Sequence, residues 1–245
     1  MADDGEEGRD WEVVILCGGR GVRLKPLTDR VPKGMVPVNG RPMLDHVVEF
    51  YRRHGARRVH FCIGYRGEVI RDHFAQAPPG LDCRFFDAGE EAGMLERLWE
   101  VREAVGERFV VAYCDTMIDL DLARLLAHHR RLGAGVTLVT SAIRNPFGVV
   151  GVGPEGWVER FEEKPVFTYF IGCFVMEKWA FREVAPAMLA QPDGAGLVTF
   201  FQHLIGLGRL GAFDHQGLQI SFNTESEHRQ AERDLQRFFT YREQS

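Results

Sequence analysis

Short apolar runs alternate with helical periodicity through the first 141 residues of the chain. Apolar runs bounded by turn residues predict buried strands, and apolar positions spaced three and four residues apart predict amphipathic helices. This alternation is typical of an α/β fold, and it predicts a Rossmann-like doubly wound mixed sheet. The strands are expected at residues 12–17, 58–63, 82–86, 109–113 and 135–141, and the helices at 42–54, 67–76, 94–105 and 120–132.

The pattern changes after residue 141. Alternating apolar and polar residues around a Pro-Glu-Gly turn at 154–156 predict a β-hairpin of strands 149–152 and 157–161. No long linker, repeat or low-complexity segment interrupts the chain, so a single domain over 12–242 is expected after a flexible N-terminus at 1–11. The remaining elements are expected to be a strand at 170–176, helices at 179–189 and 197–205, a strand pair around 211–222 and a polar C-terminal helix at 225–241.

Composition and charge narrow the function classes. The chain has 245 residues, of which 45% are hydrophobic, enough for a substantial core. Its net charge of -5 argues against nucleic acid or a membrane as partner, but it leaves room for a local basic pocket. The five cysteines are widely spaced without a C-x-x-C pair, which indicates reduced core residues. The acidic start and the lack of an apolar run of about 18 to 20 residues favour a cytoplasmic protein.

A glycine-rich loop, "LCGGRGVRL" from Leu16 to Leu24, follows the first expected strand. Glycine lets backbone N–H groups approach a ligand and arginine indicates an anion, so the loop predicts a phosphate site. The loop is not a P-loop, because no Lys-Ser or Lys-Thr follows Gly21. It is not a dinucleotide-binding fingerprint either, because Leu24 stands where that motif requires its third glycine. Asp115, in "YCDT" after the strand 109–113, is expected at the same crevice, since ligands of such sheets lie beyond the carboxyl ends of the strands.

The string "LCGGRGVRLKPLTDRVPKGMVPVNGRPMLDHVV" at 16–48 resembles the N-terminal signature of the sugar-1-phosphate nucleotidyltransferases. That signature is Gly-Gly-x-Gly-x-Arg-Leu-x-Pro-Leu-Thr, then Pro-Lys, then Pro-Val-x-Gly-x-Pro-Met, and every element is present. The stretches "GYRGEVIRDHF", "DAGEEAGMLERL", "YCDTMIDLDL", "FGVVGV…VERFEEKP" and "HQGLQISFNT" most resemble the glucose-1-phosphate cytidylyltransferase branch.

The resemblance implies a reaction and a division of the chain. The phosphate oxygen of a sugar 1-phosphate attacks the α-phosphorus of a nucleoside triphosphate, which releases pyrophosphate and leaves an NDP-sugar. Such chemistry depends mainly on positioning and charge neutralisation. The implied substrates are the triphosphate and the sugar 1-phosphate, and the implied cofactor is Mg2+. Residues 12–141 are expected to form a nucleotide-binding half, and 142–242 an acceptor-binding half with a small β-rich lobe and the C-terminal helix.

The resemblance also implies roles for particular residues. Arg23 is expected to neutralise the β and γ groups of the triphosphate, and Lys33 to lie near its α- and β-phosphates. Lys164, in "EEKP", is expected to hold the sugar phosphate, and Asp115 to bind magnesium. These four are the expected catalytic residues. The expected binding residues are Leu16, Gly18, Gly19, Gly21, Arg23, Lys33 and Gly93 for the nucleotide, Gly148, Glu163 and Lys164 for the sugar phosphate, and Asp115 and Asn223 for the metal.

Each role has a structural alternative. Lys164 can be an ordinary surface lysine, although the chain has only four lysines and two of them occupy motif positions. Glu163 can merely end a hairpin strand, and Asp115 can cap a helix. Asn223 stands where the family usually has Asp, and it can instead cap the following helix, which has glutamates in its first turn.

Departures from the cytidylyltransferase branch bear on specificity. Met94, Leu95, Glu96 and Arg97 replace its Thr-Gly-Gly-Arg and are expected to crowd the base pocket. A pyrimidine nucleotide is expected, CTP first and UTP or dTTP next, with a sugar, deoxysugar or cyclitol phosphate as acceptor. Transfer to another non-sugar phosphate or phosphonate and a catalytically silent nucleotide-sugar sensor remain alternatives. The sequence predicts no oligomeric state.

Overall fold

The computed structural model describes the backbone of residues 11–242 and the side chains of residues 11–235. The expected flexible N-terminus lies outside the described residues, except for Trp11, which is only 8% exposed and begins the first strand. Within the described range the chain forms a seven-stranded sheet. Its strands are β1 (Trp11–Leu16), β4 (Ala56–Ile63), β5 (Asp82–Asp87), β6 (Arg108–Tyr113), β8 (Val136–Arg144), β11 (Val166–Glu177) and β12 (Leu210–Asp214).

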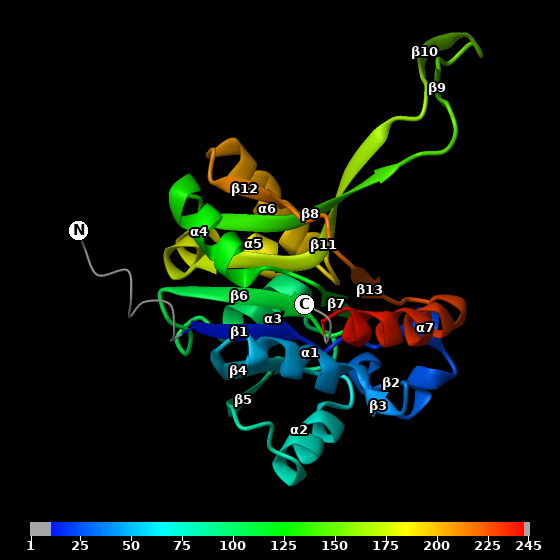
Figure 1. Ribbon diagram of the computed structural model, residues 1–245. Helices are drawn as coiled ribbons and strands as arrows, with labels where there is room; N and C mark the ends of the chain where they lie inside the picture. Colours follow the sequence, from blue (N-terminus) through cyan, green and yellow to red (C-terminus); the bar gives the residue numbers. More distant parts are fainter. Residues whose placement is uncertain (1–10, 243–245) are drawn as a thin grey trace.

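The spatial order of the strands is β12-β8-β11-β6-β1-β4-β5 (Figure 1). Strand β11 runs antiparallel to β6 and β8, and the other neighbouring pairs are parallel. The sequence-based prediction of a mixed, mostly parallel α/β sheet is therefore confirmed. The helices are α1 (Met43–Arg53), α2 (Gly67–Gln76), α3 (Met94–Glu100), α4 (Leu122–Leu132), α5 (Pro186–Leu189), α6 (Ala195–Gly206) and α7 (Glu225–Arg242).

The sheet separates two apolar clusters. Strand β1 is buried at every position, because it lies at the centre with parallel neighbours on both sides and helices on both faces. Val13 and Ile15 belong to a cluster that α1, α2, α4 and α7 cover, while Val14 and Leu16 belong to one that α3 and α6 cover. Alternate side chains of one strand thus supply both cores, as in a doubly wound fold.

Six short strands and four 3-10 helices lie outside the large sheet. The β9–β10 hairpin and the two pairs β2–β3 and β7–β13 form separate two-stranded sheets. These strands are β2 (Pro37–Val38), β3 (Arg41–Pro42), β7 (Thr116–Ile118), β9 (Val149–Val152), β10 (Val158–Glu162) and β13 (Gln219–Ser221). The 3-10 helices are η1 (Val22–Leu24), η2 (Leu27–Asp29), η3 (Lys33–Met35) and η4 (Lys178–Glu183).

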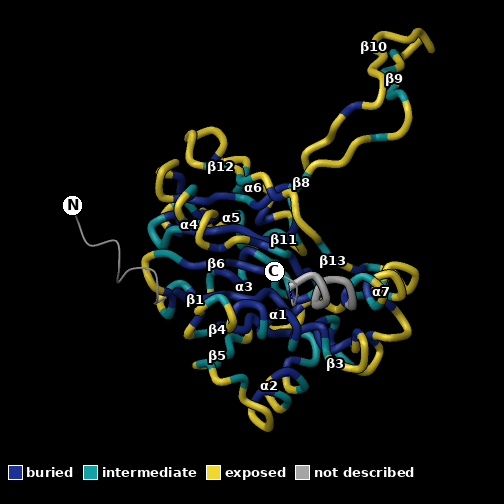
Figure 2. The backbone as a smooth tube through the Cα atoms, viewed as in Figure 1, coloured by how far each residue is buried: buried dark blue, intermediate teal, exposed yellow. Residues whose placement is uncertain are grey.

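A long antiparallel projection departs from the sheet. Strands β8 and β11 continue beyond their neighbours as a two-stranded ribbon, which ends in the β9–β10 hairpin. We call residues 141–169 the arm. It stands away from the body in Figure 1, and Figure 2 shows that its surface is mostly exposed. The arm is the structural counterpart of the small β-rich lobe expected in the second half.

Some predicted elements differ from the structure. The helix expected at 94–105 ends at Glu100. The one expected at 179–189 is divided into η4 and α5, because Pro186 has no N–H to continue the helix and disfavours a helical residue before it. The strands expected to pair around 211–222 do not pair with each other: β12 joins β8, and β13 joins β7. No helix in the described part of the chain is long and apolar enough to cross a membrane.

Candidate functional site

The glycine loop is a tight turn at the carboxyl end of β1. Gly21 has φ +60, a left-handed conformation that glycine adopts at little cost, and its carbonyl accepts a hydrogen bond from the Thr28 hydroxyl at 2.9 Å. The Leu24 N–H donates to the same carbonyl at 2.9 Å. The backbone of Gly18 extends the pairing of β1 with β4, because its carbonyl accepts from Tyr65 N–H at 3.0 Å. Gly19 is exposed. The loop therefore presents backbone at the edge of the sheet.

Four of the expected site residues meet beside this loop. The Lys33 ammonium contacts the Asp115 carboxylate and donates to Asn223 Oδ1 at 2.9 Å. The Arg23 guanidinium donates to the same amide oxygen at 2.8 Å. The Lys33 and Asp115 side chains are each only 14% exposed. We call Arg23, Lys33, Asp115 and Asn223 the Lys33 cluster.

Tertiary pairing creates this cluster from distant segments. Asp115 directly follows β6, and the N–H of its neighbour Cys114 donates to the Leu16 carbonyl at 3.3 Å, which ties the β6 end to the glycine loop. Antiparallel pairing of β7 with β13 places Ser221 opposite Thr116 and so brings Asn223 back to the same edge. The loop and Asp115 thus lie together at the carboxyl edge of the sheet, where ligands of such folds bind.

The oxygens of the Lys33 cluster suit a hard cation. Asp115 and Asn223 direct oxygen atoms at one positive charge, the Lys33 ammonium, which marks the place that a metal ion would take. Mg2+ is typically held by one or two carboxylates together with substrate phosphates. No group of three His, Cys, Asp or Glu able to hold a metal occurs among the described residues, so phosphates would have to complete the coordination. The donor set therefore fits magnesium bound together with a triphosphate.

The neighbouring thiol is chemically inert. Burial, with the nearby Asp115 charge, raises the pKa of Cys114 to about 12. The thiolate that would bind a metal or attack a substrate is therefore scarce near neutral pH. The site offers carboxylate, amide and ammonium groups without a protein nucleophile.

The start of α7 has its own cap. The Thr224 hydroxyl accepts from Glu227 N–H at 3.3 Å, and the Glu227 carboxylate accepts from the N–H groups of Asn223 and Thr224 at 2.6 and 3.2 Å. This reciprocal arrangement is a capping box. The Asn223 side chain is therefore not needed as the cap, and its oxygen faces Lys33 and Arg23.

The residues expected to hold the sugar phosphate lie together on the arm. A Cβ placed on Gly148 would lie 3.2 Å from the Glu163 carboxylate, and Glu163 pairs with the Lys164 ammonium at 3.6 Å. Lys164 has φ +47, an uncommon backbone conformation for a non-glycine residue. The Glu163 and Lys164 side chains are 62% and 56% exposed. The structure brings these three residues to one another but not to the Lys33 cluster of the same chain.

Arg97 lies beneath the glycine loop, a position that the sequence analysis did not predict. It is 4% exposed, and its guanidinium donates to the carbonyls of Ile63 at 2.7 Å and Glu90 at 3.1 Å. A Cβ on either Gly18 or Gly64 would overlap it, so both glycines leave room for this cation. Burial lowers the pKa of the guanidinium. The available signal was that Arg97 matches the Arg of the branch's Thr-Gly-Gly-Arg.

The crowding expected at the base pocket takes a different form. Leu95 is 1% exposed and packs into the core with α6 instead of facing a ligand. Gly93 is buried against the carbonyls of Gln191 and Asp193, which a Cβ would approach to 2.5 and 3.2 Å. Leu16 is 7% exposed at the end of β1. Arg97, not Leu95, is thus the bulky side chain beneath the glycine loop.

Comparison with known proteins identifies the family. The chain matches the nucleotidyl transferase family over residues 12–191, and it belongs to that family. It is 29% identical over 240 residues to the glucose-1-phosphate cytidylyltransferase of Salmonella typhi, covering 87% of this chain and 91% of that protein. It is 29% identical over 153 residues to the D-glycero-alpha-D-manno-heptose 1-phosphate guanylyltransferase of Campylobacter jejuni, covering 62% and 68% of the two chains.

A solved structure supports the fold. HddC from Yersinia pseudotuberculosis, crystallised with GMP-PN, superimposes with a TM-score of 0.69 at 19% identity and covers 92% of this chain and 99% of that one. The resemblance inferred from the glycine loop and the "VPK" motif is therefore confirmed at the level of family and fold.

Proposed function

We propose that this protein transfers a nucleotidyl group from a nucleoside triphosphate to a sugar 1-phosphate, forming an NDP-sugar and pyrophosphate. The observation that carries the proposal is the Lys33 cluster, in which two cations, a carboxylate and an amide from distant segments meet beside the glycine loop. Family membership over residues 12–191 and the sugar-phosphate transferases among its relatives support the same reaction.

The nucleotide is bound by the first half of the chain. Backbone N–H groups of the glycine loop, with Gly18, Gly19 and Gly21, cradle the triphosphate. Arg23 neutralises the β and γ groups, where negative charge builds up as pyrophosphate leaves. Lys33 exchanges its contacts with Asp115 and Asn223 for contacts with the α- and β-phosphates.

Asp115 and Asn223 would hold Mg2+ once Lys33 has moved away. When bound, the ion supplies charge neutralisation between the phosphates. The acceptor side uses Lys164 to hold the sugar phosphate, while Glu163 and the Gly148 backbone bind sugar hydroxyls. An oxygen of the sugar phosphate then forms a bond to the α-phosphorus as the bond to the β-phosphate oxygen breaks, and pyrophosphate takes the electron pair. No covalent enzyme intermediate is required.

Within this reaction we infer a pyrimidine nucleotide, CTP before UTP or dTTP. The similarity to the cytidylyltransferase of Salmonella typhi extends over 87% of this chain, compared with 62% for the guanylyltransferase of Campylobacter jejuni. Buried hydrogen-bonding groups at the loop would reject a base that leaves them unpaired, which discriminates more steeply than bulk alone.

The test is a competition of the five common nucleoside triphosphates at equal concentration, with magnesium and several sugar and cyclitol 1-phosphates. Pyrophosphate release gives the rate, and product masses identify the base and acceptor. We expect a CDP-sugar to dominate, and the Asp115→Asn variant to lose on the order of a hundredfold in rate. A dominant GDP- or ADP-linked product would contradict the base assignment alone. Failure of every pair would contradict the reaction and favour a silent sensor.

A further inference from the structure

The arm exposes an unusual number of large apolar side chains. Every residue of β10 is exposed, and the hairpin pairs with no other strand in the described part of the chain. An isolated two-stranded hairpin is marginally stable in water, and contiguous exposed apolar surface usually marks an interaction site. The most exposed of these side chains, between 62% and 75%, are Phe147, Val152, Trp157, Val158 and Phe161.

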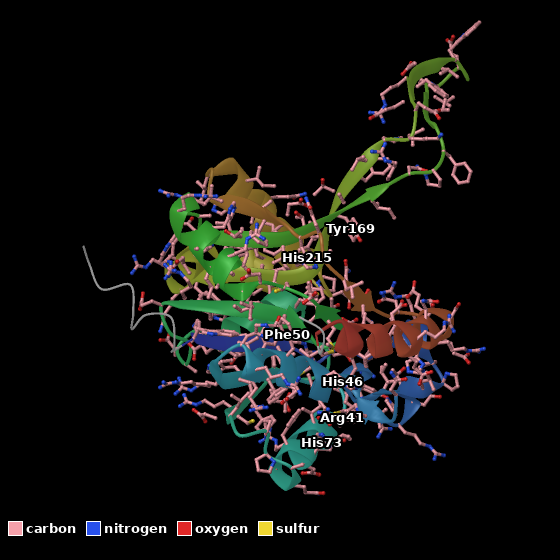
Figure 3. The ribbon with its side chains drawn as sticks, in the orientation of Figure 1. Arg41, His46, Phe50, His73, Tyr169 and His215 are labelled. Carbon is pink, nitrogen blue, oxygen red and sulfur yellow. The ribbon has the colours of Figure 1, made fainter. Side chains whose placement is uncertain are left out.

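The foot of the arm is fixed to the body. The pairing of β11 with β8 runs without a break from Phe170 opposite Thr140 to Val166 opposite Arg144. Below it, His215 N–H donates to the Thr140 carbonyl at 2.7 Å, and the Tyr169 hydroxyl donates to Gln219 at 3.4 Å. Figure 3 shows Tyr169 where the arm leaves the sheet, with His215 beneath it. These contacts direct the arm outward instead of back over its own sheet.

The glycine-loop segment has the complementary surface. Residues 18–33 contain five basic residues and one acidic residue, whereas residues 145–165 of the arm contain four glutamates and two basic residues. Val22 and Leu27, on the loop segment itself, are 62% and 37% exposed. Four of these five basic residues are exposed, and one of them, Arg20, is paired with Glu90 and Glu91. The segment therefore offers exposed basic and apolar side chains, and the arm offers acidic residues with exposed aromatic ones. A second copy of the chain carries both surfaces, so two copies can satisfy each other.

We propose that the arm docks on a second copy of this chain and places its Glu163 and Lys164 beside the Lys33 and Asp115 of that copy. The inference rests on the proposed function, which needs an acceptor-binding lysine next to the triphosphate. Within one chain, the arm that carries this lysine stands away from the body (Figure 1), and no hydrogen bond or ion pair between described residues joins it to the Lys33 cluster. Each active site is then shared between two copies, and a single copy is incomplete.

Mixed oligomers test the shared site directly. Lys164→Ala and Asp115→Asn are each expected to abolish most activity as homo-oligomers. The two variants are co-expressed with different tags, and the doubly tagged species is purified. In a two-fold pair that exchanges arms, one active site contains both substitutions and the other contains neither. About half of the wild-type rate should therefore return. A site built within one chain returns none, because each chain then carries one lesion.

The surface itself is tested by changing one exposed side chain. Trp157→Ser should weaken association at least about tenfold, since a buried interface tryptophan commonly contributes more than that. Ile205→Ser, on α6 and 63% exposed, is the matched control and should leave association unchanged. Light scattering during gel filtration over a concentration series measures both.

The outcomes separate this inference from the reaction class. An active wild-type protein that stays monomeric, or mixed oligomers without recovered activity, would overturn the shared site and leave the reaction intact. If the protein associates through Trp157 but is inactive with every substrate pair, the docking of the arm is supported and the proposed reaction is contradicted. Recovered activity in the mixed species supports both.

Discussion

At the residue scale, the proposed metal ion would compete with Lys33 for the oxygens of Asp115 and Asn223. The ammonium contacts Asp115 and Asn223 in the structure, so a cation cannot bind there until Lys33 moves. Two unit charges 4 Å apart repel by about 4 kcal/mol at an effective dielectric constant of 20. The free protein should therefore bind metal weakly, and the triphosphate should strengthen binding by drawing Lys33 away.

Removing the Lys33 charge should let a metal ion bind before the triphosphate does. In Lys33→Met, Mn2+ binding without nucleotide should tighten by about tenfold or more, even though nucleotide binding and turnover fall. Titration followed by electron paramagnetic resonance measures the free ion. Lys25→Met is the control, since Lys25 lies on the same segment, its side chain is 61% exposed, and it pairs with Asp29 instead. Equal Mn2+ affinity in wild type and both variants would show that Lys33 does not occupy a metal site.

At the same scale, Asn223 would set how strongly the proposed metal ion is held. Asn223→Asp adds a second carboxylate and should lower the magnesium concentration needed for half-maximal rate, because a charged ligand binds the ion more tightly than an amide. Asn223→Ala should raise that concentration. Magnesium titrations of the initial rate compare the three proteins. The same magnesium requirement in all three would leave Asp115 as the single protein ligand.

At the element scale, a buried carboxylate joins three segments at the opposite end of β1 from the site. Glu12 accepts from His60 at 2.8 Å and from Arg58 at 3.3 Å on β4, and also from the Gly106 N–H before β6. Burial pushes the pKa of Glu12 upward, but hydrogen bonds from His60 and Gly106 outweigh it and leave the pKa below its ordinary 4.5. The ionised form is therefore the one that holds these elements together.

This arrangement predicts acid sensitivity. Because the folded-state pKa is depressed, the stabilisation is fully present above pH 4.5 and is lost as the pH falls through the lower folded value. Glu12→Gln should cost about 2 kcal/mol near neutral pH and flatten the dependence below 4.5. Urea denaturation on both sides of that pH measures the free energy of unfolding. Glu103→Gln, at a side chain that is 83% exposed, is the control and should leave both quantities unchanged.

At the scale of the whole molecule, the arm should be the first part to be cut by a protease when it is not docked. Arg144 and Arg160 are exposed arm residues, whereas the body buries its strands in two cores. Cleavage of exposed segments follows their local opening free energy, which is smallest where few apolar contacts exist. Trypsin should therefore cut after these residues in dilute protein, and more slowly as concentration rises and arms dock. Intact-mass spectrometry locates the cuts, and earlier cleavage within the sheet would contradict this order of stability.

Much of the local structure, and the family, could be predicted from the order of residues alone. The apolar run at 13–16 before the glycine loop predicted β1, because a central parallel strand is covered on both faces and is therefore mostly apolar. Helix α2 lies at 67–76 as predicted, and β9 lies at 149–152, since local periodicity and turn residues set such elements. The motif from 16 to 48 indicated the nucleotidyl transferase family without any knowledge of long-range contacts.

Which residues meet depends instead on long-range strand pairing and packing. Asn223 reaches Asp115 through the pairing of β13 with β7, and no local pattern encodes a partner that lies so far along the chain. The same holds for Arg97, whose place beneath Gly18 and Gly64 depends on how α3 packs on the ends of β1 and β4. The residues at Glu163 and Lys164 were identified from a motif, but their position on an outward arm follows from the register of β8 and β11. Periodicity reports which face of an element is apolar, whereas burial and strand pairing between distant segments decide what that face contacts.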